Sequence, residues 1–179
     1  MPVGPRTVAR MFDGMFGASG ELYHIGMRAA HLESALAELG ATHQVDWTEI
    51  AERDFTVWEP GNGYRTYPLR LAFSRRGPVR LEILEGVPGS HWDGREVPGP
   101  HHLGVWVDDV GAEIERLTAR GWTLEFAANS PEEGYGRFAY IRSPQGILFE
   151  PVDVANRPRF EAWWAGGELA AHRDDPPAP

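Results

Sequence analysis

Two histidines and two glutamates stand at matching places in two related stretches of the chain. His24 and His102 are each followed two residues later by a glycine, and Glu82 and Glu150 each lie in a short apolar run behind a turn. Imidazole and carboxylate groups are ligands for a borderline or hard divalent cation, and four of them leave one or two coordination positions for water or substrate. The residue types therefore predict a catalytic site for one divalent metal ion per chain, with Zn, Ni, Co, Mn or Fe(II) as candidates.

Strand periodicity predicts that these four side chains share a face. Alternate residues of a strand point to opposite sides of a sheet. We therefore expect Tyr23, Ile25 and Met27 to face a covering helix. His24 should point to the opposite side of the sheet. Gly26 and Gly104 leave space beside the histidines. Each residue also has an ordinary interpretation, as a satisfied strand histidine or a solvated carboxylate, but four matched positions favour the metal site.

The elements that must hold these residues occur twice in one order. Each histidine strand is followed by a segment rich in Ala, Leu and Glu, and the predicted helices are Leu32 to Leu39 and Val110 to Ala119, each ending at a glycine, Gly40 or Gly121. Three strand-like runs follow each helix. In the first copy they are His43 to Ile50 or Phe55 to Trp58, then Tyr67 to Ser74, then Val79 to Leu84. In the second copy they are Thr123 to Ala127, Arg137 to Ile141 and Ile147 to Val152.

This order predicts an α+β fold of two βαβββ modules. We expect an N-terminal arm over residues 1–20, the first module over 21–88, a linker over 89–99 and the second module over 100–154. Residues 155–179 should form a C-terminal helix and a disordered tail. The wider stretch from Gly86 to Gly99 is rich in Gly and Pro, as is typical of a linker.

Composition excludes several classes of function. The chain has 179 residues, a formal net charge of -9 and no cluster of basic residues, which argues against a nucleic-acid partner. It has no cysteine, so thiolate ligands and disulfides are excluded, and no lysine, so Schiff-base chemistry is excluded. No apolar run is long enough to cross a membrane and the N-terminus does not resemble a signal peptide, so we expect a cytoplasmic protein.

The motifs resemble the four metal-ligand strands of the vicinal oxygen chelate superfamily, which includes glyoxalase I, methylmalonyl-CoA epimerase, extradiol dioxygenases and metal-free bleomycin-sequestering proteins. They are Tyr23-His24-Ile25-Gly26, Leu81-Glu82-Ile83, His101-His102-Leu103-Gly104 and Phe149-Glu150-Pro151. The resemblance covers Glu21 to Asp153 and implies a cleft of curved mixed sheets with helices outside. Ala29-Ala30-His31 departs from the pattern, since many relatives carry an aspartate there, and we assign His31 to the helix start rather than to the metal.

The resemblance also implies a class of reaction. Extradiol dioxygenases of this family have no ligand at the position of Glu82, so its presence favours an isomerase, epimerase or lyase that acts through a metal-stabilised enolate of a carbonyl substrate. Glu82 or Glu150 would then serve as the general base. The alternatives are an extradiol-type dioxygenase and a metal-free drug-sequestering protein.

Aromatic residues and an arginine predict the rest of the substrate site. The candidates are Trp47, Tyr67, Trp106, Phe138, Tyr140 and Arg142. They suit a small carbonyl or aromatic substrate, although several of them, with Trp163 and Trp164, could only fill a core. Relatives often pair their modules across a subunit interface, and the apolar segment Phe160 to Leu169 offers contact surface, so we expect a homodimer.

Overall fold

One order of elements is repeated along the chain, and a single helix follows the second copy. The computed structural model describes residues 20–170, so the expectations for the preceding arm and for the disordered tail lie outside the described residues. The first module contains β1 (Glu21–Arg28), α2 (Leu32–His43), β2 (Ala51–Glu59), β3 (Gly63–Phe73) and β4 (Arg80–Gly86). The second contains β5 (Gly99–Val107), α3 (Val110–Thr118), β6 (Thr123–Ala127), β7 (Ala139–Arg142) and β8 (Leu148–Asp153). The last helix is α4 (Arg157–Trp164), and short 3-10 turns at Pro131–Glu133 and Val154–Asn156 complete the elements.

The strands form one closed barrel with an internal two-fold pattern. Their order is β1-β4-β3-β2-β6-β7-β8-β5. Counted from its first strand, β1 or β5, each module places its strands in the order first, fourth, third, second. The first strands of the two modules, β1 and β5, pair antiparallel, whereas the other junction, between β2 and β6, has only the pair Trp58 and Ala127. This arrangement confirms the predicted α+β fold of two βαβββ modules around a curved mixed sheet.

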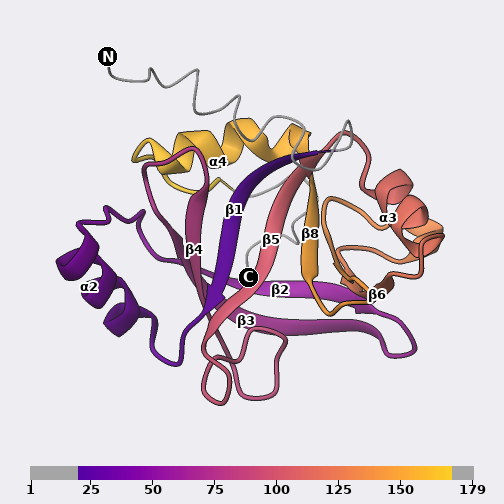
Figure 1. Cartoon of the computed structure of the whole chain (residues 1–179), viewed down its shortest axis with the longest axis horizontal. Coiled ribbons are helices and arrows are strands. Elements are labelled where there is room, and N and C mark those ends of the chain that lie inside the picture. Colours follow the sequence, from indigo (N-terminus) through magenta and orange to yellow (C-terminus); the bar gives the residue numbers. More distant parts are fainter. Residues whose placement is uncertain (1–19, 171–179) are drawn as a thin grey trace.

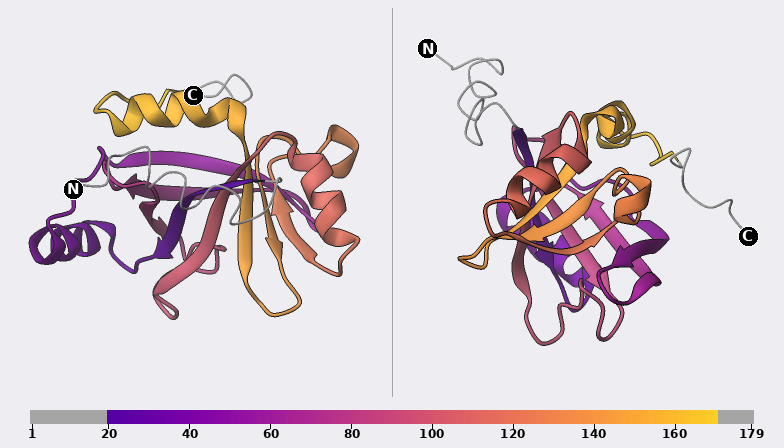
Figure 2. Two further views of the ribbon diagram at one scale, coloured as in Figure 1. Left: turned by 45° about the horizontal axis from the view of Figure 1, so that its top comes forward. Right: turned by 90° about the vertical axis from the view of Figure 1, so that its right-hand side faces the viewer.

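The helices α2 and α3 cover the outside of the barrel, one on each module (Figures 1 and 2). Under α2, Leu32 packs with Met27 of β1 and Ile83 of β4. Under α3, Ile114 packs with Val105 of β5 among other apolar side chains. Each cluster joins a helix to outward-facing apolar side chains of the barrel, and the cluster under α3 also includes Leu22 of β1.

The helix α4 lies across one end of the barrel (Figure 2). Its residues Trp163 and Trp164 are buried, and they join Phe160 in the interior cluster with Phe73 and Tyr23. These aromatic side chains therefore fill the core instead of offering a surface to a second subunit. The homodimer stays a prediction without support from this segment, and light scattering can test it.

Two boundaries differ from the sequence-based expectation in the first module. The helix α2 continues past Gly40 to His43, and Gln44 takes the left-handed conformation that ends it, with φ of 56°. A glycine inside a helix costs only about 1 kcal/mol, which packing on the sheet can offset. The segment from His43 to Ile50 is not a strand either: Trp47 makes one isolated bridge to Ser74, and β2 follows at Ala51.

The linker between the modules contributes to the core. Trp92 is 1% exposed and packs against Phe126 and Tyr140 inside the barrel. The preceding His91 is held by the buried carboxylate of Glu59, whose Oε1 lies 2.9 Å from His91 Nε2. A segment whose composition is typical of a linker therefore carries one of the largest buried side chains of the protein.

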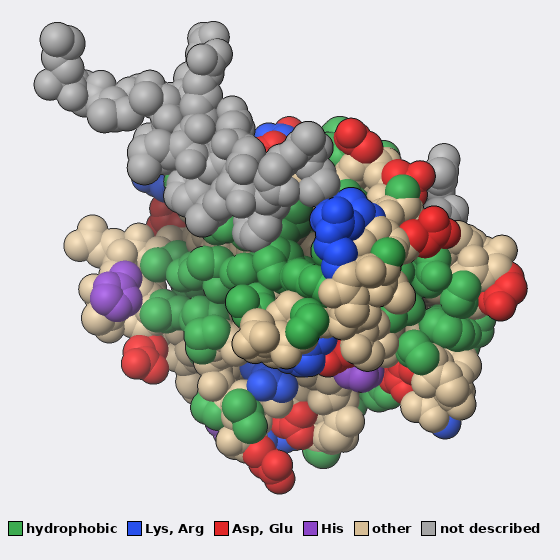
Figure 3. All heavy atoms as spheres, turned by 45° about the vertical axis from the view of Figure 1, so that its right-hand side comes forward, with side chains coloured by type: hydrophobic (Ala, Val, Ile, Leu, Met, Phe, Trp, Pro, Cys, Tyr) green, Lys and Arg blue, Asp and Glu red, His purple; other side chains and the backbone are tan. Residues whose placement is uncertain are grey.

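The surface mixes apolar and acidic side chains. On the face shown in Figure 3, acidic side chains are scattered around the edge, and hydrophobic side chains gather closer to the centre. A shallow apolar groove of about 230 Å³ runs beside α3, where Leu117, Trp122 and Phe149 form part of its lining. Within residues 20–170, the helices are too short or too polar to traverse a bilayer.

Candidate metal centre and cavity

Four side chains from four strands converge on one point inside the barrel. The Nε2 atoms of His24 and His102 lie 2.7 Å apart. Glu82 Oε2 lies 3.3 Å from His24 Nε2 and 3.2 Å from His102 Nε2. Glu150 Oε2 mirrors it, at 3.2 Å from His24 and 3.3 Å from His102. The structure therefore brings together all four side chains that the sequence singles out as metal ligands.

Strand register explains this convergence. In the ladder β4-β1-β5, Glu82 pairs with Gly26, which in turn pairs with His102. In the ladder β8-β5-β1, Glu150 pairs with Gly104, which pairs with His24. Each row therefore reads glutamate, glycine, histidine, and it joins the glutamate of one module to the histidine of the other.

The two glycines make room for the histidine rings. A Cβ added at Gly26 would lie 2.0 Å from a ring atom of His102, and one added at Gly104 would lie 1.9 Å from a ring atom of His24. Real Cβ atoms do not approach other atoms this closely, so the imidazoles occupy space that only glycine leaves. The glycine two residues after each histidine serves the histidine of the other module.

Burial and charge act against one another at these four groups. Burial lowers the pKa of His24, but the carboxylates of Glu82 and Glu150 outweigh it and raise this pKa to about 9. Burial raises the pKa of Glu82, but the two imidazoles outweigh it and bring this pKa down to about 2. The pKa of His102 is raised and that of Glu150 lowered by the same balance. The glutamates are thus carboxylates at neutral pH, and cationic charge at the centre is favoured.

The donor set fits a divalent cation. Ligand atoms about 2.1 Å from a tetrahedral or octahedral ion lie roughly 3.0 to 3.4 Å from one another, close to the distances between these imidazole and carboxylate atoms. Within the described residues, the buried Oε2 of Glu82 makes no well-aligned hydrogen bond, although it lies close to both imidazoles. Two nitrogen and two oxygen donors suit Zn, Ni, Co, Mn or Fe(II) better than they suit a purely hard ion such as Ca²⁺.

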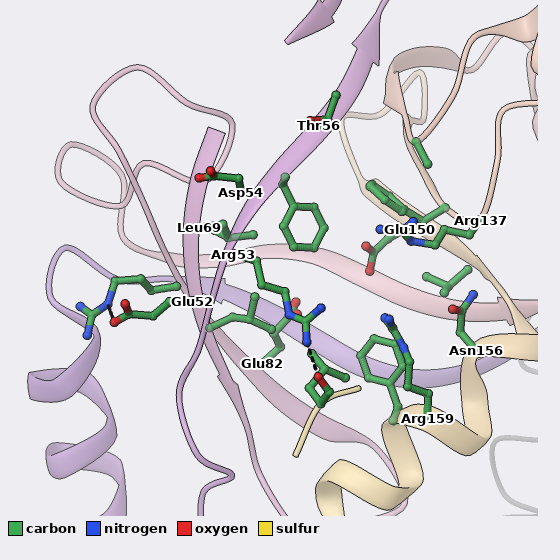
Figure 4. Close-up of a pocket in the computed structure, with 18 of the residues that line it drawn as sticks. Glu52, Arg53, Asp54, Thr56, Leu69, Glu82, Arg137, Glu150, Asn156 and Arg159 are labelled. Carbon is green, nitrogen blue, oxygen red and sulfur yellow. Dashed lines mark hydrogen bonds and ion pairs between the residues drawn. The ribbon is translucent and has the colours of Figure 1, made fainter. Parts of the chain in front are cut away.

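A cavity of about 1020 Å³ opens beside the four residues (Figure 4). Glu82 and Glu150 line it, whereas His24 and His102 lie behind them in the wall and are at most 3% exposed. The carboxylates therefore stand between the histidines and any molecule in the cavity. Apolar lining comes from Phe55, Leu69, Leu71, Phe138 and Phe160.

Three of the residues predicted to bind substrate lie near the centre. Phe138 lines the cavity. Tyr140 is buried beside it, with its hydroxyl 3.4 Å from His102 Nε2 and its ring stacked on Phe126. Trp106 is 3% exposed and stacks on Tyr23, with ring centroids 3.7 Å apart, so it supports the cavity wall from behind.

The other three lie elsewhere. Trp47 packs under α2 and donates to the Leu36 carbonyl oxygen at 3.0 Å. Tyr67 donates to Glu59 Oε1 at 2.6 Å, next to the linker. Arg142 forms an ion pair with Glu125 at the end of β7. None of these three side chains is part of the cavity lining in the described structure.

The predicted orientation of Tyr23 is wrong. Strict alternation along β1 would turn it toward a helix with Met27, but Tyr23 lines the cavity. The pairing of β1 with β5 shifts register between Leu22 and His24, and this irregularity turns Tyr23 and His24 to the same side. Tyr23 lies edge-on to the His24 ring, with centroids 4.4 Å apart.

Sequence reasoning missed the polar residues of the cavity wall. Arg53 of β2, Arg159 of α4 and Asn156 before that helix all line the cavity. Arg53 could have been found, because it shares the inward parity of Phe55 and Val57. The place of α4 over the barrel end had no signal in the sequence.

Solved structures with this fold confirm the architecture. A hypothetical protein from Bacillus halodurans C-125 matches with a TM-score of 0.54 and 19% identity, over 75% of this chain and 94% of that chain. A Streptomyces coelicolor methylmalonyl-CoA epimerase variant in complex with 2-nitronate-propionyl-CoA matches with a TM-score of 0.52 and 18% identity, over 76% and 95%. A 4-hydroxymandelate synthase variant from Streptomyces coelicolor has the same TM-score of 0.52 and 18% identity, over 76% of this chain and 48% of that one. At these identities the matches establish the fold alone.

The family is established by a sequence model. No curated protein matches significantly. Residues 23–140, about two thirds of the chain, match the model of the Glyoxalase/Bleomycin resistance protein/Dioxygenase superfamily, which agrees with the motifs, the repeated module and the barrel. The chain therefore belongs to the glyoxalase, bleomycin resistance protein and dioxygenase superfamily.

Proposed function

We propose that the protein is a metal-dependent enzyme that moves a proton at the carbon next to a carbonyl group, as an isomerase, epimerase or lyase. The observation that carries this proposal is the convergence of His24, Glu82, His102 and Glu150 at one wall of a large cavity, with both carboxylates on the cavity side. These four residues would hold one divalent cation. When bound, the cation would stabilise negative charge that develops on a substrate oxygen.

The carboxylates supply the proton acceptor. Glu82 and Glu150 line the cavity, with side chains 9% and 14% exposed, so either can meet a substrate that enters it. Their pKa values are lowered by the two histidines, so both are carboxylates at neutral pH. A carboxylate beside a carbon whose proton is acidified by a neighbouring oxyanion can remove that proton and return it.

The histidines hold the carboxylates in place. His24 and His102 are 0% and 3% exposed and reach both carboxylates through Nε2. Tyr23 and Phe138 extend the wall beside them with aromatic surface. Removal and return of a proton by these carboxylates suits isomerisation or epimerisation, and because the carboxylates line an open cavity, the proton can exchange with solvent before it is returned.

Deuterium uptake tests this function directly. The full-length protein, loaded in turn with Zn, Ni, Co, Mn or Fe(II), would be incubated in deuterated water with α-hydroxy ketones, 2-oxo hemithioacetals, acyl-CoA thioesters and aromatic carbonyl compounds. We expect metal-dependent deuterium incorporation that falls by roughly a hundredfold or more in Glu82→Gln or Glu150→Gln. Glu52→Gln is the matched control, since Glu52 lines the cavity but binds Arg70 instead of the four-residue centre.

Other outcomes of this experiment would favour the alternative functions found in the superfamily. Oxygen consumption with a catechol and no proton exchange would contradict the proposal in favour of a dioxygenase. A protein that retains no metal after loading would contradict it in favour of a sequestering function. Metal occupancy must be measured in each glutamine variant, because loss of a carboxylate ligand weakens metal binding as well as proton transfer.

A further inference from the structure

Two arginines at the cavity already bind oxygen acceptors. Arg53 donates through Nη2 to the carbonyl oxygen of Leu169, and Arg159 donates through Nη1 to that of Ala170 at 3.1 Å. Both arginines and Leu169 line the cavity. The segment after α4 thus places two backbone carbonyls on guanidinium groups at the cavity wall.

Resting on the proposed function, we propose that Arg53 and Arg159 form the subsite for a substrate carboxylate, and that the carbonyls of Leu169 and Ala170 occupy it until an acid binds. The substrate would then be an organic acid whose carboxylate lies away from the reacting carbon. Asn156, on the same wall, would accept a hydrogen bond from a hydroxyl or N–H group near that carboxylate.

The position of the arginines in the cavity supports this assignment. Arg53, Arg137 and Arg159 line the cavity, whose other charged residues are Arg70 and the four carboxylates of Glu52, Asp54, Glu82 and Glu150. Figure 4 shows the first three arginines coming from different elements and extending toward the space beside Glu82 and Glu150. Each of the three is half-buried, so an anion that reaches them is partly shielded from solvent. Three guanidinium groups at one cavity can offer several hydrogen-bond donors to a single anionic group.

The chemistry of the guanidinium group favours exchange of the carbonyls for a carboxylate. An arginine presents several N–H donors in a planar fork that matches the two oxygens of a carboxylate. A backbone carbonyl offers one neutral oxygen, whereas a carboxylate offers two oxygens and a full negative charge to the same guanidinium fork. The contacts to Leu169 and Ala170 are therefore weaker than those that an acid can make.

Asn156 adds an unused acceptor to the same wall. It is 2% exposed and lines the cavity. Its Nδ2 is committed to the Asp153 carbonyl oxygen at 3.2 Å, which fixes the amide orientation, and its Oδ1 has no hydrogen-bond partner. A buried acceptor without a partner is costly, so a ligand donor at this point would be favourable.

Aromatic surface lies next to these polar groups. Phe160 follows Arg159 on α4, and Phe55 shares the inward face of β2 with Arg53. Phe55 and Phe138 contact each other with centroids 5.9 Å apart. The body of the acid should therefore be aromatic or otherwise apolar.

Calorimetric titration of matched probes tests the subsite. The full-length protein in the presence of EDTA would be titrated with 3-phenyllactate, with its uncharged amide and with 3-phenylpropionate, which lacks the hydroxyl group. We expect phenyllactate to bind roughly tenfold or more tightly than its amide, because the amide carries no negative charge and only one acceptor oxygen for the guanidinium groups. It should also bind more tightly than phenylpropionate, because only the hydroxyl can donate to Asn156.

Single substitutions test which residues cause these binding preferences. Arg53→Gln and Arg159→Gln should each reduce the preference for the acid over the amide several-fold, and Asn156→Ala should remove the preference for phenyllactate over phenylpropionate. Arg142→Gln is the matched control, because it removes the same charge from an arginine outside the cavity and should leave both preferences intact. Thermal unfolding of every variant would verify that it is folded.

The proposal is overturned if the wild-type protein binds the acid and the amide equally or binds neither at millimolar concentration. It is also overturned if both arginine variants keep the full preference. Chelation removes the metal from this measurement, so its failure is distinct from an absence of metal-dependent deuterium uptake, which concerns only the proton-transfer proposal.

Discussion

Gly104 lies directly across the β1–β5 ladder from His24, and the imidazole ring fills the space that a side chain at position 104 would occupy. We predict that Gly104→Ala displaces His24 and weakens metal binding roughly 10- to 100-fold, the range found when a metal ligand loses its orientation. Titration with Zn in the presence of a competing chelator measures the effect. Gly26→Ala should act on His102 in the same way.

Gly40→Ala is the control for these glycine variants. Gly40 lies in α2, where an added Cβ would meet its nearest neighbour at 3.5 Å, an ordinary contact. That substitution should leave metal affinity unchanged and stabilise the helix by up to about 1 kcal/mol. Unchanged metal binding in Gly104→Ala would mean that the position of His24 is unimportant for the cation.

Removal of a predicted ligand should have a larger effect. His24→Ala and His102→Ala each delete one of four donors, so we expect metal affinity to fall by more than roughly a hundredfold. This loss should exceed that of the glycine variants, which only displace a ligand. Elemental analysis after loading and desalting should find one metal ion per chain in the wild-type protein and almost none in the variants. His43→Ala, at the exposed end of α2, provides a matched control.

The metal-free protein should lose stability as the pH rises above neutrality. The pKa of His24 is about 9 in the folded protein against an ordinary 6.5, so its protonation stabilises the fold fully below about 6.5, and this contribution is lost as the pH rises through about 9. Glu82 affects stability in the opposite direction. Its pKa is about 2 in the folded protein against an ordinary 4.5, so its contribution to stability is lost as the pH falls through about 2. Stability in EDTA should therefore be greatest between about pH 4.5 and 6.5.

Urea denaturation in EDTA across this pH range checks the prediction. In His24→Gln the decline between about pH 6.5 and 9 should be smaller, because the group that titrates there is gone. Metal affinity of the wild-type protein should change in the other direction and rise with pH, since a cation replaces the protons on the imidazoles. A stability in EDTA that is flat or rises through this range would contradict the assignment of raised pKa to the histidines.

Trp92 should be a major source of stability despite its place in the linker. Trp92→Ala removes a fully buried indole from contact with Phe126 and Tyr140, and we expect a loss of about 3 to 5 kcal/mol in the free energy of unfolding. Chemical denaturation measures it. Val97→Ala, in the same linker but 60% exposed, should change stability by less than about 0.5 kcal/mol. Equal effects of the two substitutions would show that the linker does not contribute to the core.

The sequence predicted those features that local pattern controls. The repeated order of elements and the His-x-Gly spacing depend on short-range periodicity, and the fold confirms that order. The side of the sheet taken by Met27 also followed from alternation. Alternation failed at Tyr23, because a register shift between two strands distant in sequence leaves no mark on either strand alone.

Features set by long-range packing could not be predicted in this way. The burial of Trp92 depends on the space between two modules. The arrival of Arg159 and Asn156 at the cavity depends on where α4 crosses the barrel end. The helix α2 ends at Gln44, which takes the left-handed conformation that sequence rules assign to the glycine at position 40.

Each row of paired residues joins the glutamate of one module to the histidine of the other, and this has a consequence for folding and evolution. Neither βαβββ module contains more than half of the donor set, so the four atoms come together only when the modules dock through β1 and β5. A cation held there would act as a cross-link between the two halves, and partial unfolding of either half would release it. The same symmetry would let two copies of a single ancestral module assemble the whole centre at their interface, with gene fusion later making that interface intramolecular.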